Sequence, residues 1–356
     1  MNLRLTQHKA TNMRYILLGF LFFILSIDLK AQDPRFAQFY AAPDQLNPAM
    51  NVVYEGRMRF IANYRDQWAS VLNDVPFRTM AAHLDFRFNV GRNDYFAVGL
   101  NGLRDEAGSS NFTQTNGNIN LAFMKYLGGS SKKSYYLVAG AQGGVGQRQI
   151  DIGNLWFSEQ FDQENVAIDF ALPSGETGMD RSNIYPDFSA GVMWYTISGD
   201  NSFYLGAAMY HINGPNVSLF DEQVEPLLER YVAHLGGEIS LSRYLSLLPA
   251  AAVHFQGPSM DVNVGANIRY SADEDGLALR IGGWGHLANN LDNGVGLEAF
   301  TVTTFLEMES WMVGLSYDIN VSQLTPASNS RGAFEATFIY LLPEQGRRGR
   351  VSCPKF

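Results

Sequence analysis

The sequence predicts an all-β protein, a transmembrane antiparallel outer-membrane β-barrel of about 14 strands. Three observations indicate this fold. The chain starts with a segment typical of a secretory signal, and no later apolar run has the length of a spanning helix. About 14 later segments carry apolar residues at every second position. Because a bilayer admits only helices or closed barrels, an exported chain of amphipathic strands is expected to close into a barrel.

Residues 1–31 are expected to be a cleaved signal peptide. Arg4, Lys9 and Arg14 form a basic start, residues 16–27 form an apolar centre, and residues 29–31 suit a cleavage site. A retained membrane anchor is the alternative, but the apolar centre is shorter than the roughly 20 residues of a spanning helix. Cleavage removes four basic residues and one acidic residue, so the formal net charge goes from -9 to -12. An acidic chain gives no electrostatic reason to expect nucleic acid as a partner.

The barrel is expected over residues 57–342. In one late segment Val313, Leu315 and Tyr317 share one face, while Ser316 and Asp318 share the other. Apolar residues facing lipid and polar residues facing the lumen are the pattern of transmembrane strands. The expected strands are 57–65, 77–88, 95–104, 112–126, 135–149, 185–198, 202–213, 231–242, 246–256, 260–271, 276–287, 293–305, 310–320 and 332–342.

The lengths of the connections support the same fold. Connections after odd-numbered strands include the long segments 66–76, 150–184, 214–230 and 321–331. Connections after even-numbered strands are all short and rich in turn-forming residues, such as the Gly-Asp-Asn at 199–201. Long outer loops and tight periplasmic turns are the asymmetry of outer-membrane barrels, which predicts an outer-membrane location.

Residues 32–56 are expected to form a periplasmic N-terminal arm, because their prolines suit an irregular segment better than a strand. Its candidate residues are Phe36, Phe39, Tyr40, Asn47 and Pro48. They are expected to pack as a plug on the inner wall or the periplasmic rim, or to present a site for a periplasmic component.

Residues 343–356 form a basic tail, expected in the periplasm. Cys353 is the only cysteine, so an internal disulfide is excluded.

Two further groups are candidate sites. Arg65, Asp66 and Trp68 lie where the first strand meets the first outer loop, which suits a rim salt bridge beside an interfacial tryptophan. The long acidic connection 150–184 contains four aromatic residues, Trp156, Phe157, Phe161 and Phe170. Clustered exposed aromatics mark interaction sites. The connection is expected either to form a docking surface or to fold inward and constrict the lumen.

The sequence gives no support for an enzyme, a cofactor or a metal site. The histidines of the expected strands have no carboxylate or cysteine at ligand spacing. The glycines at 143–146 imitate a phosphate-binding loop, but no helix and no Lys-Ser/Thr pair follows them. Glycines within a strand more often relieve crowding.

Several blocks of the mature chain resemble the PorP/SprF family. The arm contains QDPRFAQFY at 32–40 and LNPA at 46–49, and YRDQW follows at 64–68. Residues 314–320 and 331–335 are similar to the closing motifs of the family, and the ending CPKF is similar too. One departure follows Pro48 and Ala49, where the family has a small Ala-Gly turn and this chain has Met50 and Asn51.

The resemblance implies a non-enzymatic outer-membrane accessory of type IX secretion and gliding motility. Its implied partners are periplasmic or outer-membrane secretion components and the C-terminal domain of a large secreted adhesin, which it helps to export or to attach to the surface. A general porin or hydrophobic-solute channel is the alternative, with Asn263, Asn267 and Arg269 lining the lumen. A purely structural barrel is a third possibility.

Overall fold

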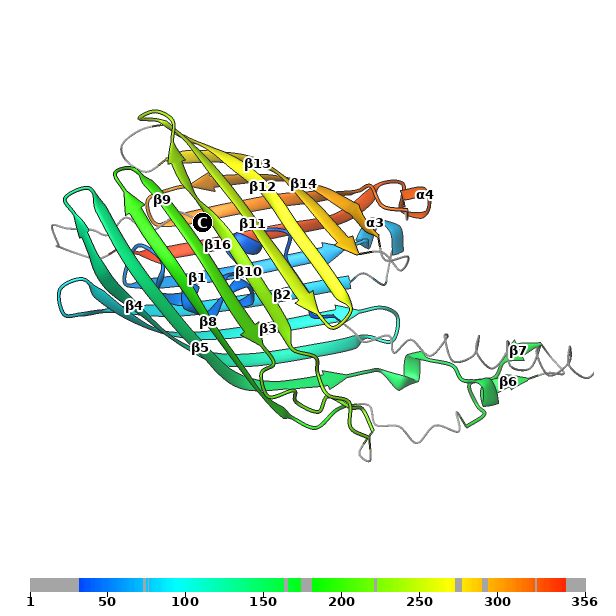
Figure 1. The fold of residues 1–356 in the computed structure, drawn as a ribbon. Helices are drawn as coiled ribbons and strands as arrows, with labels where there is room; N and C mark the ends of the chain where they lie inside the picture. The colour runs from blue at the N-terminus through cyan, green and yellow to red at the C-terminus, as the bar shows by residue number, and fades with distance from the viewer. Residues whose placement is uncertain are drawn as a thin grey trace, which may run out of the picture. The chain divides into compact units, whose positions relative to one another are not determined.

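Fourteen antiparallel strands close into a barrel in the computed structural model of the protein, and the first strand pairs with both the second and the last (Figure 1). The structure describes residues 32–343 except 73–74, 76, 163–165, 174–180, 221–222, 273–276, 290–293 and 324. The expected signal peptide and the basic tail beyond residue 343 lie outside the described residues. No helix within the described residues is long and apolar enough to cross a membrane.

The prediction of a 14-stranded barrel is confirmed. The barrel strands are β1 (Met58–Gln67), β2 (Phe77–Val90), β3 (Asp94–Ala107), β4 (Phe112–Ser130), β5 (Lys133–Gln149), β8 (Tyr185–Ser198), β9 (Asn201–Tyr210), β10 (Arg230–Ser240), β11 (Leu245–Gln256), β12 (Ser259–Ser271), β13 (Ala278–Asn289), β14 (Val295–Glu307), β15 (Trp311–Asn320) and β16 (Arg331–Leu342). Each strand pairs with its neighbours in an antiparallel register, so every edge is closed.

Several short elements are not strands of the barrel wall. They are η1 (Phe39–Ala41), α2 (Pro43–Leu46), η2 (Pro48–Val52), α3 (Ala69–Leu72), η3 (Ile152–Asn154), η4 (Ser158–Gln160), α4 (Thr325–Ser328) and the two-residue strands β6 (Phe161–Asp162) and β7 (Ala167–Ile168). The first three belong to the N-terminal arm, and β6 pairs with β7 in the 150–184 connection.

The strands present apolar side chains outward and polar side chains inward. On β15, Leu315 and Tyr317 are 48% and 44% exposed, whereas Ser316 and Asp318 are buried. On β12, Ile268 and Tyr270 are exposed, while Asn267 and Arg269 are buried. The outer surface is therefore an apolar band suited to lipid, as the alternation predicts.

The two ends of the barrel differ. The end at which β1 finishes carries the connections 68–76, 150–184, 211–229 and 321–330, and we call it the long-loop end. The opposite end, which we call the short-turn end, carries only connections of a few residues, such as 91–93 and 199–200. Long connections at one end and short turns at the other are the usual asymmetry of outer-membrane barrels.

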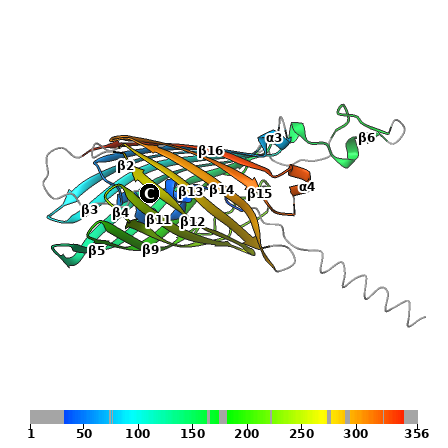
Figure 2. The ribbon, with the colours of Figure 1, turned by 90° about the horizontal axis from the view of Figure 1, so that it is seen from above.

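The N-terminal arm, residues 34–56, lies inside the barrel. Its short helices are enclosed by strands in both views (Figures 1 and 2). Most of its side chains are buried, and Ala49, Met50 and Val52 are 0% exposed. The apolar core of the protein is thus the packing of the arm against the inner wall.

Candidate functional site

The arm runs along the lumen from one end to the other. The Asn63 side chain, halfway along β1, donates a hydrogen bond to the carbonyl of Ala41 over 3.2 Å. Arg59, nearer the short-turn end, donates to the carbonyl of Met50 over 3.2 Å. The arm therefore starts near the long-loop end and descends as its residue numbers increase. The arm thus packs on the inner wall, one of the two positions expected from the sequence, because inward polar residues of β1 bind its backbone.

A buried carboxylate holds the start of the arm. Glu335 on β16 is 1% exposed and accepts hydrogen bonds from the backbone N–H groups of Ala37 (2.5 Å) and Gln38 (3.0 Å). Arg65 on β1 binds Glu335 over 2.5 Å and Asp318 over 2.8 Å. Two carboxylates and one guanidinium thus join the arm to three strands, since charged groups are kept in a barrel interior only when they are paired.

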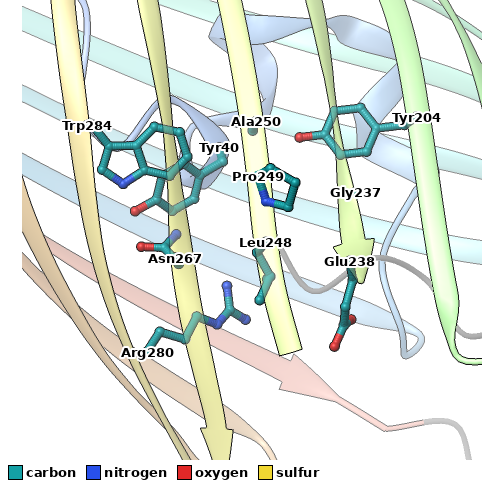
Figure 3. Close-up of a pocket in the computed structure, with 10 residues that line it drawn as sticks. All are labelled: Tyr40, Tyr204, Gly237, Glu238, Leu248, Pro249, Ala250, Asn267, Arg280 and Trp284. Atoms are coloured by element: carbon teal, nitrogen blue, oxygen red, sulfur yellow. The ribbon is translucent and has the colours of Figure 1, made fainter. Parts of the chain in front are cut away.

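Aromatic packing anchors the next part of the arm. The Tyr40 ring lies 5.0 Å from the ring of Trp284 on β13, and the Phe39 ring lies 5.3 Å from Trp284 in an edge-to-face arrangement. Figure 3 shows Tyr40 beside Trp284, with Asn267 close to the phenol. Burial raises the pKa of Tyr40 to about 12, so the phenol stays neutral at physiological pH. The adjacent cavity of about 20 Å³ has room for roughly one water molecule.

A contact between a carboxylate of the arm and an imidazole of the wall follows on α2. Asp44 contacts the imidazole of His83 on β2, and both side chains are 2% exposed. Arg59 pairs with Asp85 over 2.8 Å beside them. Burial raises the pKa of Asp44, but the interactions with His83 and Arg59 outweigh burial and hold the pKa below its usual range. The sequence has no carboxylate at ligand spacing from His83, and the carboxylate that contacts it comes from the arm, 39 residues earlier in the chain.

Asn47 and Pro48 lie against the wall formed by β5, β8, β9 and β10. The Asn47 amide donates to the carbonyls of Val192 (3.1 Å) and Ala207 (3.2 Å), and it lies 2.9 Å from Nε2 of His234. Its carbonyl oxygen accepts from the N–H of Ala49, which caps η2. Asn47 thereby fixes both the start of η2 and its position in the barrel.

Glycines on the facing strands make room for this segment. A Cβ atom at Gly140 would collide with the backbone of Pro48 and Ala49, and a Cβ atom at Gly191 would collide with the Asn47 side chain. A glycine within a strand often marks the close approach of another backbone. These glycines are therefore a signal in the sequence for a segment packed against the inner wall.

The predicted rim group divides between the two faces of β1. Arg65 points into the lumen, as described above. Asp66 pairs with Arg78 over 3.9 Å and accepts a hydrogen bond from Tyr64 over 3.0 Å. Trp68 has a positive φ of 59° and packs edge-to-face on Phe77, with ring centroids 5.6 Å apart. Arg65 and Asp66 therefore serve different contacts, because neighbouring residues of a strand face opposite sides.

The 150–184 connection exposes most of its aromatic side chains. Trp156 is 56% exposed, Phe161 is 42% exposed and Phe170 is 67% exposed, while Phe157 is half-buried. The N–H of Phe157 donates to the side chain of Gln160, which orders η4. These side chains are therefore not packed against one another in a closed cluster.

Metal ligands are not assembled in the part of the chain that the structure describes, where no three His, Cys, Asp or Glu side chains could hold an ion. His211, which follows β9, lies 2.9 Å from Asp187 and forms a pair of its own.

Fold and site together define an outer-membrane β-barrel whose lumen is filled by its own N-terminal arm. The model of the family described as type IX secretion system membrane protein PorP/SprF matches residues 28–340, nearly the whole chain. The protein belongs to this family and is a membrane protein of type IX secretion.

No curated protein matches the chain. Among solved structures, it is similar to the toluene transporter TodX of P. putida, with 10% identity, a TM-score of 0.43, and 84% of this chain and 93% of that chain covered. It is also similar to the toluene transporter TbuX of Ralstonia pickettii, with 12% identity, a TM-score of 0.44, and coverage of 83% and 91%. CdiB from Acinetobacter baumannii gives 7% identity, a TM-score of 0.44, and coverage of 80% and 60%. At such low identities and scores we draw no functional conclusion from these likenesses.

Proposed function

We propose that this protein is a non-enzymatic outer-membrane accessory of type IX secretion. In this proposal it captures or anchors the C-terminal domain of a large, gliding-motility type adhesin at the cell surface. The observation that carries the proposal is the filled lumen. Buried side chains of the arm, from Phe36 to Tyr54, occupy the interior of the barrel. A barrel filled in this way is suited to binding partners at its two ends.

The outer partner surface is proposed on two connections of the long-loop end. Trp156, Phe161 and Phe170 lie on the first, and the second, 211–229, exposes Phe220 (46%) and Val224 (80%). Exposed aromatic side chains supply large contact areas and are enriched at protein interfaces. The described acidic residues of the first connection, such as Glu159 and Asp169, favour a partner with basic groups around an apolar patch.

The inner partner is proposed to be a periplasmic component of the secretion machinery. The short-turn end faces the periplasm in this proposal, and β16 ends there at Leu342. The signal peptide at 1–31 remains a prediction that fits export through the inner membrane.

An open diffusion channel is the competing proposal. Asn263, Asn267 and Arg269 point inward, as a polar channel would require, and all three are buried. Arg269 is engaged by Glu307 over 2.9 Å, and Asn267 accepts a hydrogen bond from Thr303 over 2.8 Å. These residues therefore support the inner wall, which favours the accessory role over the channel.

Deletion of residues 155–170 tests the proposed docking surface. We expect the adhesin to be released into the medium, while the barrel still reaches the outer membrane and keeps its heat-modifiable mobility on gels. The control replaces Leu241 and Tyr244, exposed residues of a short turn, with serine, and it should leave the adhesin on the cells. Unchanged surface retention after the deletion would contradict the docking proposal.

A further inference from the structure

The inner wall binds the backbone of the arm at several points. Glu335 accepts from the N–H groups of Ala37 and Gln38, and wall side chains donate to the carbonyls of Ala41 (Asn63, 3.2 Å), Asp44 (Tyr210, 2.8 Å), Gln45 (Arg230, 3.4 Å), Met50 (Arg59, 3.2 Å) and Tyr54 (Arg87). Every residue carries a backbone carbonyl, and every residue except proline carries an N–H group. These contacts therefore recognise a polypeptide as such, whatever its side chains.

The half of the inner wall nearer the long-loop end, which we call the outer half, also contacts two side chains of the arm. Directly after the two N–H groups that bind Glu335, the rings of Phe39 and Tyr40 pack on Trp284. An aromatic pair of this kind contributes area and preferred ring geometry to binding. The recognised element is thus two consecutive N–H groups followed by two adjacent aromatic side chains.

The outer half of the arm also lies toward the long-loop end. Arg35 pairs over 3.1 Å with Asp261, near the start of β12, and the Arg35 side chain is 25% exposed. The deeper segment around Met50 is fully buried. A polypeptide that enters from the long-loop end therefore meets the Glu335 and Trp284 contacts before the deeper ones.

We propose that the outer half of the lumen is a polypeptide-binding site. Residues 34–41 occupy it in this structure, and it exchanges them for a segment with two free N–H groups followed by adjacent aromatic residues. This site is separate from the 150–184 connection. Failure of the exchange experiment and failure of the adhesin-release experiment are therefore distinguishable.

The first test uses the full-length mature chain with Phe36→Cys and Cys353→Ser. Phe36 is 4% exposed, so a thiol reagent should label its replacement slowly. A synthetic peptide of residues 34–42 should raise the labelling rate at least about threefold, in a saturable manner, because it displaces the arm. A peptide with an ester oxygen in place of the N–H of Gln38 cannot donate that hydrogen bond to the Glu335 carboxylate. It should need about tenfold higher concentration to give the same labelling rate. The Arg35→Ala peptide is the control and should change by less than about fivefold, because its ion pair is partly solvated.

A second test does not require the Phe36→Cys variant to fold. A protease site inserted between Gly56 and Arg57 allows the arm to be cut from the barrel after folding. A labelled peptide of residues 34–56 should then replace the cut arm, with the same tenfold penalty for the ester at position 38. Three results would overturn the proposal. They are a labelling rate that does not change when the peptide is added, a cut arm that the labelled peptide never replaces, and equal affinities of the barrel for the ester peptide and the parent peptide.

Discussion

Glu335 on the last strand accepts a hydrogen bond from Arg65 on the first strand over 2.5 Å. The two residues are register partners across the β1–β16 pair that closes the barrel. The same carboxylate binds the backbone of the arm at Ala37 and Gln38. One buried carboxylate therefore takes part both in the strand pair that closes the barrel and in the binding of the arm.

Replacing Glu335 with glutamine should destabilise the protein by about 3–5 kcal/mol, because it leaves the Arg65 guanidinium without one of its two carboxylates in a buried site. Denaturant unfolding in detergent, followed by tryptophan fluorescence, measures the change. Asp66→Asn is the matched control on the outer face of β1. Its pair with Arg78 is long, at 3.9 Å, and partly exposed, so the cost should stay below about 1 kcal/mol. Equal losses in the two variants would contradict the role assigned to Glu335.

Gly140→Ala should displace the arm without breaking the barrel, because the new methyl group would occupy the position of the Pro48 and Ala49 backbone. We expect the arm to become sensitive to added protease while the barrel strands stay protected. Gly117→Ala on β4 is the control, since nothing lies within 4 Å of a Cβ atom there. The close approach of arm and wall would be disproved if both variants kept a protected arm.

Trp284→Ala should cost about 3–5 kcal/mol, as expected for the loss of a buried tryptophan that packs against two aromatic residues of the arm. Trp194→Ala provides the comparison. That side chain is 38% exposed on the outer surface and stacks on Tyr135 at 6.3 Å, so its removal should cost clearly less. Thermal unfolding in the same detergent measures both, and a larger loss for Trp194 would argue against an anchor at Trp284.

Asp44→Asn should show a pH-dependent effect. Because the pKa of Asp44 is held below its ordinary value of 3.8, the carboxylate contributes stability that is complete above about that pH and is lost as the pH falls through the lower pKa of the folded protein. We therefore expect the variant to be less stable than the parent at neutral pH, by about 2–4 kcal/mol, with the difference shrinking below pH 3.8. A difference that stays constant down to acid pH would contradict this assignment.

The barrel strands were predictable because their signal is local. In a strand such as β15, the polarity of each residue indicates which face of the barrel it lies on, as Leu315, Ser316 and Tyr317 alternate between outside and inside. The number of strands and the unequal connections follow from the same pattern and from turn-forming residues. Boundaries shifted by a few residues, as at β4, which continues to Ser130 instead of ending at 126, because tight turns extend the pairing into the connection.

The candidate site was less predictable because its contacts join distant parts of the chain. His83 and Asp44 are 39 residues apart, and Ala37 and Glu335 are 298 residues apart. No local pattern reports such pairs. The sequence singles out Phe36, Phe39 and Tyr40, and all three are buried, but the course of the arm through the lumen depends on the inward faces of many strands. The glycines opposite Asn47 and Pro48 were the one available signal.

Ion conductance of the intact mature protein in a planar lipid bilayer tests most directly whether the arm fills the lumen. We predict no steady current from the intact protein, and a stable current once residues 34–56 are removed or displaced. A steady open pore from the intact chain would contradict the filled lumen and would favour a diffusion channel.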